Sequence, residues 1–314
     1  MDVVVFGAGS LGSLVGGLLA RAHDVTLVGR DPHVHAVVRD GLGVTGVESF
    51  VVRPEATADG TGLSADLAVV TVKAFDTAAA AEALATGGYG AALSLQNGMG
   101  NEDVLAERLD CPILAGTTTL GAVLSGPGAV EWRGRGEVVL GRWRGSDDRA
   151  DATDRETGTA GTPPVEERVA AAFREAGVET TVAGDVRVPL WEKLAVNAAI
   201  NPTTALARVD NGALASPAAS DLVEPVTRET AAVARAEGVD LTDDDAIEAV
   251  RRVASATARN HSSMRQDVTA GRRTEIDAIT GYVVDRAGRR GVAVPVNRTL
   301  FALVRTWEAE RNLR

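Results

Sequence analysis

The sequence predicts an α/β protein of two domains, an N-terminal Rossmann-like doubly wound parallel sheet and a C-terminal all-helical domain. The first half of the 314 residues alternates short apolar runs with alanine-rich helical segments. These runs are apolar almost throughout, which is typical of parallel strands covered on both faces. After residue 165, patterns with a helical period of 3.6 residues replace them. A chain of this length is also long for a single core.

The apolar runs define the predicted strands, which are DVVVFGAG, HDVTLVGR, DLAVVTVK, GAALSLQNG, PILAGTTTLG and VETTVAG. Residues 132–143 predict one more hairpin or edge pair. Helices are expected at residues 165–176, 189–199, 218–237, 243–258, 274–288 and 296–310. We place the domains at 1–184 and 185–314. The polar stretch 145–164 lacks apolar periodicity and is expected to be a flexible surface insertion.

Composition narrows the classes of function. A net charge of −11 argues against a nucleic-acid partner, because phosphate binding needs a clustered basic face. No apolar run approaches the roughly 18 residues of a membrane span, and no basic leader precedes the first strand, so we expect a cytoplasmic protein without a membrane partner. The lone Cys111 has no companions for a disulfide or a zinc site, so we expect it to be buried, and no metal site is expected.

A glycine-rich turn follows the first strand directly and opens a helical run. This context favours a dinucleotide site, in which the backbone approaches a pyrophosphate at a helix N-terminus. A flavin site, an S-adenosylmethionine site or a plain glycine-rich turn are the alternatives. The residues concerned are Gly7, Ala8, Gly9, Ser10, Leu11 and Gly12.

Arg30 ends the second strand, where a site for NAD usually has an acidic residue. A guanidinium suits the 2′-phosphate of NADPH, which is therefore the expected cofactor. The alternative is an exposed arginine beside Asp31, which caps the next helix.

Lys73 and Asn97 follow two further strands, at the sheet edge where ligands of open α/β sheets bind. A surface lysine and an Asn-Gly turn are the plainer explanations. Lysine occurs only at positions 73 and 193, whereas arginine supplies the other basic side chains. A position that keeps lysine is thus a candidate for chemistry that a guanidinium cannot do.

The segment VPLWEKLAVNAAINPTTAL carries Lys193, Asn197 and Asn201 at spacings of four residues, on one face of an otherwise apolar helix. A buried lysine is costly unless it has a partner or a task. The alternative is a solvated stripe on an ordinary amphipathic helix. Further along, in NHSSMRQDVTAGRRTEID, Glu275 is either catalytic or part of helix-capping chemistry.

Taken in order, the motifs GAGSLG, TVKAFDT, QNGMGNED, LWEKLAVNAAINPTTAL, SSMRQDV and RRTEID resemble those of the ketopantoate reductase (2-dehydropantoate 2-reductase) family. The resemblance implies NADPH-dependent reduction of 2-dehydropantoate to pantoate, for pantothenate and coenzyme A biosynthesis. The stretch 145–164 has no counterpart in it. A reductase of another branched keto acid, or a non-catalytic NADP(H)-binding regulator, are the alternatives.

The resemblance also assigns roles to residues. In the second domain, Lys193 would be the proton donor and Glu275 would assist at the substrate oxygen. The substrate-binding residues would be Asn97, Asn197, Asn201, Asn211 and Ser263. Toward the cofactor, the glycines would cradle the pyrophosphate, Arg30 would meet the 2′-phosphate, and Lys73 with Asn97 would line the nicotinamide end.

Residues without an assigned role are His261, Met264 and Asp267, which are expected to be structural. The resemblance implies a small-molecule keto acid as the partner. The oligomeric state stays open, with a homodimer among the alternatives.

Overall fold

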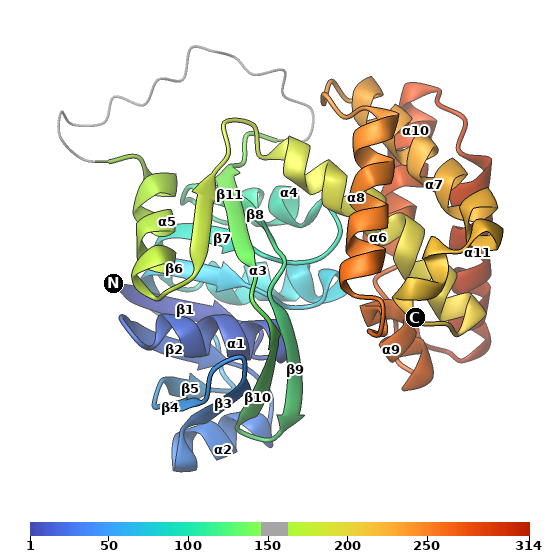
Figure 1. The fold of residues 1–314 in the computed structure, drawn as a ribbon. Coiled ribbons are helices and arrows are strands. Elements are labelled where there is room, and N and C mark those ends of the chain that lie inside the picture. Colours follow the sequence, from blue (N-terminus) through green and yellow to red (C-terminus); the bar gives the residue numbers. More distant parts are fainter. Residues whose placement is uncertain (146–162) are drawn as a thin grey trace. The chain divides into compact units, whose positions relative to one another are not determined.

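The computed structural model describes residues 1–145 and 163–314, which divide into two compact units (Figure 1). Unit 1 consists of Met1–Gln96 with Asn101–Val186, and unit 2 of Asn97–Gly100 with Arg187–Arg314. The insertion predicted at 145–164 lies, for residues 146–162, outside the described part of the chain.

The loop Asn97–Gly100, here called the Asn97 loop, corrects the predicted domain limits. Sequence reasoning gave it to the N-terminal domain, but it groups with the helices of unit 2. A backbone hydrogen bond of 3.0 Å, in which the N–H of Met99 donates to the carbonyl of Ala278, contributes to this grouping.

A large sheet forms the centre of unit 1 (Figure 1). Its strands are β1 (Asp2–Phe6), β2 (Asp24–Val28), β5 (Glu55–Thr57), β6 (Ser64–Val70), β7 (Gly88–Ser94), β8 (Ile113–Thr118), β11 (Glu137–Arg142) and β12 (Glu179–Val182). In the described residues their order is β12-β11-β8-β7-β6-β1-β2-β5. All neighbours are parallel except β8 and β11. The predicted parallel-dominated sheet is thereby confirmed.

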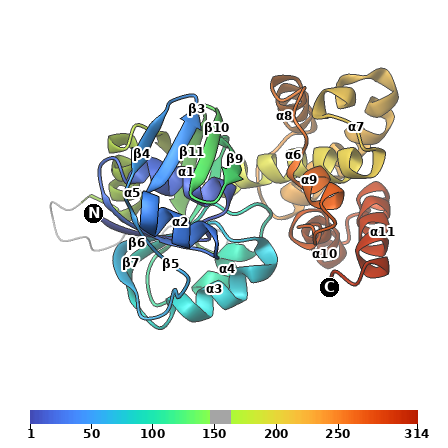
Figure 2. The same ribbon diagram turned by 90° about the horizontal axis from the view of Figure 1, so that it is seen from below.

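Helices cover both faces of this sheet, because its central strands are buried and apolar. Figure 2 shows α1 and α5 on one face and α3 and α4 on the other. Phe173 of α5 and Leu14 of α1 belong to one continuous core with Val5 of β1. The helical elements of unit 1 are α1 (Ser10–Leu19), α2 (His33–Asp40), the 3-10 turn η1 (Ala74–Asp76), α3 (Thr77–Leu84), α4 (Asn101–Ala106) and α5 (Val165–Glu175).

A second, smaller sheet was not predicted. In the described residues it has the order β4-β3-β10-β9 and packs on α1. Its strands are β3 (Leu42–Gly46), β4 (Phe50–Val52), β9 (Gly121–Gly126) and β10 (Ala129–Gly134). The hairpin or edge pair expected at 132–143 is therefore wrong, because β10 lies between β9 and β3 and β11 lies between β8 and β12.

Unit 2 is helical, as predicted. Its elements are α6 (Arg187–Ala207), the 3-10 turn η2 (Asn211–Ala215), α7 (Pro217–Ala236), α8 (Asp243–Ala256), α9 (Ser263–Thr269), the π turn η3 (Asp277–Gly281), α10 (Tyr282–Arg290) and α11 (Pro295–Glu310). α6 is the central helix, since it packs against α7, α8, α9 and α11. α9 was not predicted, and the helix expected at 274–288 begins as the π turn. No helix in the described ranges combines the length and the hydropathy needed to span a bilayer.

His33 joins three segments of unit 1. Its Nδ1 accepts the backbone N–H of Gly128 at 3.1 Å, so its Nε2 carries the proton and donates to Ser13 Oγ at 3.0 Å. The ring thus ties α2 to α1 and to the turn between β9 and β10. Burial lowers the pKa of His33 below 6.5, and a hydrogen bond with the backbone of Gly126 opposes this in part. The neutral imidazole is the form that can make both hydrogen bonds, because a protonated ring could not accept the N–H of Gly128.

This arrangement predicts a pH dependence of stability. The unfolded chain takes up a proton at His33 more readily than the folded chain, so the contribution is complete above about pH 6.5 and declines as the pH falls below it. His33→Gln should lower the free energy of unfolding by about 1–3 kcal/mol at pH 7.5 and flatten its decline between pH 7.5 and 5.5. Urea unfolding followed by tryptophan fluorescence measures both. His35→Gln, which changes an exposed histidine of the same helix, is the control. An unchanged pH slope in His33→Gln would contradict the assignment.

Candidate active site

The predicted cofactor residues of unit 1 follow parallel neighbouring strands. β1 pairs with β2 on one side and with β6 on the other. The carboxyl ends of these strands therefore meet at one edge of the sheet, which is where open α/β sheets bind ligands. The turn that begins at Gly7 leaves β1 at this edge, Arg30 follows β2 and Lys73 follows β6.

The glycine-rich turn is shaped by contacts within the chain. Gly7 has φ +112°, and a Cβ there would lie 2.7 Å from the backbone nitrogen of Val72. A Cβ on Gly12 would lie 2.2 Å from the carbonyl oxygen of Gly7, so only glycine lets α1 start this close to the strand. At Gly9 the nearest atom to such a Cβ is 3.9 Å away. Gly9 is exposed, and its backbone is open to a ligand.

The N-terminus of α1 suits an anion. Gly9 is its N-cap and provides no side-chain cap, so the first N–H groups of the helix lack that partner. Ser10 Oγ accepts from the backbone N–H of Leu124 at 3.1 Å. Ala8 is buried and Leu11 half-buried, so these two offer backbone rather than side chain. The helix dipole and the accessible glycine together fit a pyrophosphate group.

Arg30 is available to a phosphate. Its side chain is 88% exposed, and its Nη2 lies 3.2 Å from Oδ2 of Asp76 in η1. An exposed ion pair of this kind is worth about 1 kcal/mol or less, so a doubly charged phosphate could compete with the carboxylate. Lys73 is half-buried and immediately precedes η1. The structure thus shows two cationic side chains in loops at this sheet edge.

The polar stripe on α6 is partly withdrawn from solvent. Lys193 and Asn197 are half-buried, and Asn201 is only 5% exposed. Trp191 and Leu194 next to them are buried as well. Polar groups on the central helix of a unit need partners to the extent that they are buried, so this stretch of α6 differs from its apolar neighbours.

Ser263 is held close to this helix by its neighbour. Ser262 caps α9 by accepting the N–H of Arg265 at 3.1 Å, and its hydroxyl lies 2.7 Å from Thr204 Oγ1 of α6. Ser262 thus ties α9 to α6 and places Ser263 in the first turn of α9. Sequence reasoning missed this tie, although a serine before a helical run is a recognisable capping signal.

Asn211 begins η2 and is buried. Its side-chain amide donates to Thr257 Oγ1 at 2.9 Å, and its backbone N–H donates to the carbonyl of Asn260 at 3.1 Å. These bonds fasten η2 to the segment that follows α8. Asn211 therefore has a clear structural task in addition to the predicted contact with substrate.

Glu275 and the Asn97 loop are brought together by the π turn η3. Glu275 is buried, and its carbonyl accepts the N–H groups of Ala278 and Ile279, both at 3.1 Å. The Asn97 loop is fastened to the same turn through Met99 and Ala278. Gly98 has φ +79°, and a Cβ there would lie 2.6 Å from the carbonyl oxygen of Ala278, so the approach requires glycine. Asn97 and Glu275 thus belong to one framework.

These contacts extend to α6, the helix that carries Lys193. Tyr282, the first residue of α10, lies against Gly100 of the Asn97 loop, where a Cβ would be 3.5 Å from the ring. On α6 it meets Trp191, with ring centroids 5.8 Å apart. Trp191 stands two residues before Lys193. Unit 2 therefore holds Asn97, Lys193 and Glu275 on three directly packed segments.

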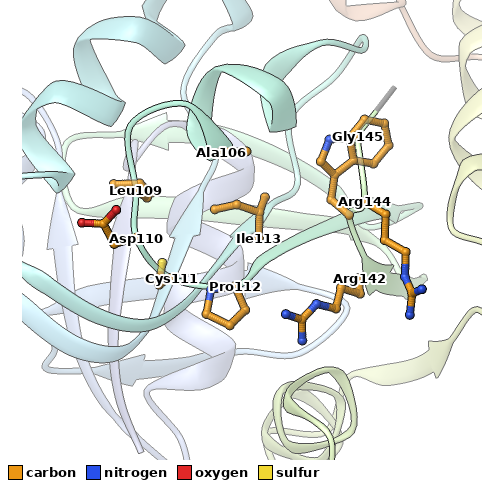
Figure 3. Close-up of a pocket in the computed structure, with 10 residues that line it drawn as sticks. Ala106, Leu109, Asp110, Cys111, Pro112, Ile113, Arg142, Arg144 and Gly145 are labelled. Carbon is orange, nitrogen blue, oxygen red and sulfur yellow. The ribbon is translucent and has the colours of Figure 1, made fainter. Parts of the chain in front are cut away.

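A groove of about 640 Å³ lies elsewhere in unit 1 (Figure 3). Its lining residues are Ala106, Leu109, Asp110, Cys111, Pro112, Ile113, Arg142, Trp143, Arg144 and Gly145. Because Ile113 begins β8, this groove is at the amino end of that strand, opposite to the edge of the cofactor residues. Cys111 is half-buried there rather than buried as expected, and burial raises the pKa of its thiol. None of the predicted site residues lines it.

Comparison with known proteins identifies the family. The model of "Ketopantoate reductase PanE/ApbA" matches residues 3–145, and that of its C-terminal domain matches residues 185–308. A 2-dehydropantoate 2-reductase of Halobacterium salinarum is 46% identical over 313 residues, which cover 97% of this chain and 98% of the relative. The chain belongs to the ketopantoate reductase family.

Solved structures agree with this family assignment. A ketopantoate reductase of Ralstonia eutropha JMP134 superposes with a TM-score of 0.85 at 35% identity, covering 99% of this chain and all of the other. D-mandelate dehydrogenase, in a ternary structure with NADH and anilino(oxo)acetate, superposes with a TM-score of 0.87 at 24% identity over the whole of both chains. At that identity the likeness shows a common fold. Among the described residues, no group of three or more His, Cys, Asp or Glu side chains could hold a metal ion.

The glycine geometry predicts two different outcomes for one chemical change. Gly12→Ala should lower the free energy of unfolding by about 1–3 kcal/mol or more, since the added methyl group meets the carbonyl of Gly7. Gly9→Ala should lower the free energy of unfolding by less than about 1 kcal/mol, which is the usual difference between glycine and alanine at an N-cap. Urea denaturation compares the two variants. Equal losses would show that the space beside Gly9 is not open.

Proposed function

We propose that this chain catalyses the NADPH-dependent reduction of 2-dehydropantoate to pantoate, a step of pantothenate and coenzyme A biosynthesis. Its family membership and the 2-dehydropantoate 2-reductases among its relatives support this substrate. The observation that carries the proposal is the half-buried Lys193, in the same framework as Glu275 and the Asn97 loop.

The cofactor proposal rests on the fit of unit 1. Gly9 leaves room for a pyrophosphate at the start of α1, and Arg30 offers an exposed guanidinium for a 2′-phosphate. When bound, NADPH would supply a hydride from C4 of its nicotinamide. Side chains of the protein would orient the keto acid and protonate its oxygen.

Lys193 is proposed to protonate the substrate. As a hydride adds to the ketone carbon, the C=O double bond becomes a single bond and negative charge grows on the oxygen. The Lys193 ammonium can stabilise this charge and transfer one proton to it, after which solvent returns a proton to the amine. A positioned proton donor contributes about 10² to 10⁴ in rate, or about 3–5.5 kcal/mol.

The polar neighbours would orient the keto acid. Asn197 and Asn201 follow Lys193 on the same face of α6, so their carboxamides can contact the same small molecule. Ser263, placed by the tie between Ser262 and Thr204, would hold the carboxylate. Glu275 would accept a hydrogen bond from the substrate or from the hydroxyl that forms.

The decisive experiment is NADPH oxidation against a panel of branched 2-keto and 3-keto acids that includes ketopantoate. The proposal expects ketopantoate to have the highest kcat/KM. A higher value for another acid would reassign the substrate within the same fold. No turnover of any acid by folded protein that binds NADPH would make the chain a binding protein rather than an enzyme.

Lys193→Arg tests the role of the lysine without removing the positive charge. A guanidinium keeps its proton with a pKa above about 12, so it can bind an oxyanion but is a poor acid. We expect kcat to fall by at least about 100-fold, while NADPH binding by fluorescence titration and the circular dichroism spectrum are retained. Arg252→Lys is the control. Arg252 of α8 pairs with Glu192, which lies next to Lys193 on α6, so this variant exchanges one cation for another without touching Lys193. Near wild-type kcat in Lys193→Arg would remove Lys193 as the proton donor.

Arg30→Ala tests the choice of cofactor. A lost charge-assisted contact with the 2′-phosphate should raise the KM for NADPH at least about tenfold, equivalent to about 1.5–3 kcal/mol, and leave that for NADH almost unchanged. Arg39→Ala is the control, because Arg39 is likewise exposed and paired with an aspartate. Similar changes for both cofactors would refute the assignment.

A further inference from the structure

Glu308 on α11 has a fully buried carboxylate, which the proposed reaction does not use. Both of its oxygens are engaged. Oε1 accepts from the backbone N–H and from the hydroxyl of Thr274, each at 2.7 Å, and Oε2 accepts from Arg314 at 2.7 Å. Burying a charge is expensive, and a buried ion pair rarely stabilises a fold more than apolar side chains would. A specific geometric task explains its presence better than stability does.

What Glu308 holds is the backbone around Glu275. Thr274 precedes Glu275, and its N–H is bound by Glu308. Its hydroxyl, which donates to Glu308, also accepts the N–H of Ile276 at 3.2 Å. One carboxylate thus fixes the peptide between Arg273 and Thr274 directly, and the peptide between Glu275 and Ile276 through the hydroxyl of Thr274.

Arg314 connects this carboxylate to the π turn that follows. Besides binding Glu308, it donates to Asp277 Oδ2 at 3.1 Å. Arg305 of α11 donates to Asp277 Oδ1 at 3.0 Å. The segment that carries Glu275 is therefore clamped by α11 and Arg314 both before and after the glutamate.

We propose that Glu308 is a positioning residue, which acts through Thr274 to hold Glu275 in place for the reduction. This inference rests on the proposed function, in which Glu275 meets the substrate. Preorganisation of this kind matters because a misplacement of about 1 Å can cost up to about 100-fold in rate.

A double-mutant cycle tests the proposal. Glu308→Gln keeps the size of the side chain but sets an amide against Arg314. Thr274→Val replaces the hydroxyl by a methyl group of similar size and leaves the backbone N–H in place. Each should lower the kcat for ketopantoate about tenfold or more in the wild-type background, and less than about twofold when Glu275→Gln is already present. The KM for NADPH should not change. The matched controls on α11 are Glu310→Gln and Thr306→Val, which alter exposed side chains.

The outcomes separate this inference from the function on which it rests. Equal fold losses in both backgrounds would mean that Glu308 is only structural, and an unchanged kcat would overturn the proposal directly. If Glu308→Gln fails to fold, Thr274→Val decides the question alone. No turnover by the wild-type protein would overturn the proposed function and this inference together, whereas wild-type turnover with additive losses overturns this inference only.

Discussion

Parallel pairing of β1 with β2 and β6 is the constraint from which the geometry of unit 1 follows. It requires the loops after these strands to leave from one edge, so that the chain must turn there at once. The N–H groups of Gly7 and Ala8 both donate to the carbonyl of Val28, at 2.9 and 2.8 Å, which starts the turn in register with the neighbouring strand. α1 then begins so close to β1 that Gly12 has no room for a side chain. The pairing thus places the N-terminus of α1 and the loops that carry Arg30 and Lys73 at one edge of the sheet.

In unit 2 the comparable constraint is the position of α6 inside the helical unit. A helix that packs against several neighbours has little room for polar groups, and most buried polar groups in proteins are hydrogen-bonded. Thr204 is matched by Ser262, and the Asn97 loop and the π turn meet through Met99 and Ala278. Lys193 stands on this helix, half-buried among these segments.

Much of this could be predicted from local sequence, because the deciding interactions are local. The turn of Gly7 and Gly12 and the stripe of Lys193 depend on spacings within one element. The small sheet could not be predicted, because β3 and β10 pair across more than eighty residues and their strands are short. For the same reason local pattern alone predicts a hairpin or edge pair at 132–143, whereas the two strands there pair with segments far along the chain. Glu308 gives no sequence signal either, since a glutamate near a helix end is ordinary and its partner Thr274 is 34 positions away.

The Asn97 loop makes the helical unit discontinuous along the gene. The family models match residues 3–145 and 185–308, so the loop lies in the first matched segment although it packs with the helices. A fragment that starts at Arg187 would leave the carbonyl of Ala278 without Met99 and uncover one side of Tyr282. The two segments that the family models match therefore cannot be exchanged independently between relatives. A chimera between relatives that is joined at a single splice would combine an Asn97 loop from one parent with a π turn from the other, and would have to keep both sides of that contact compatible.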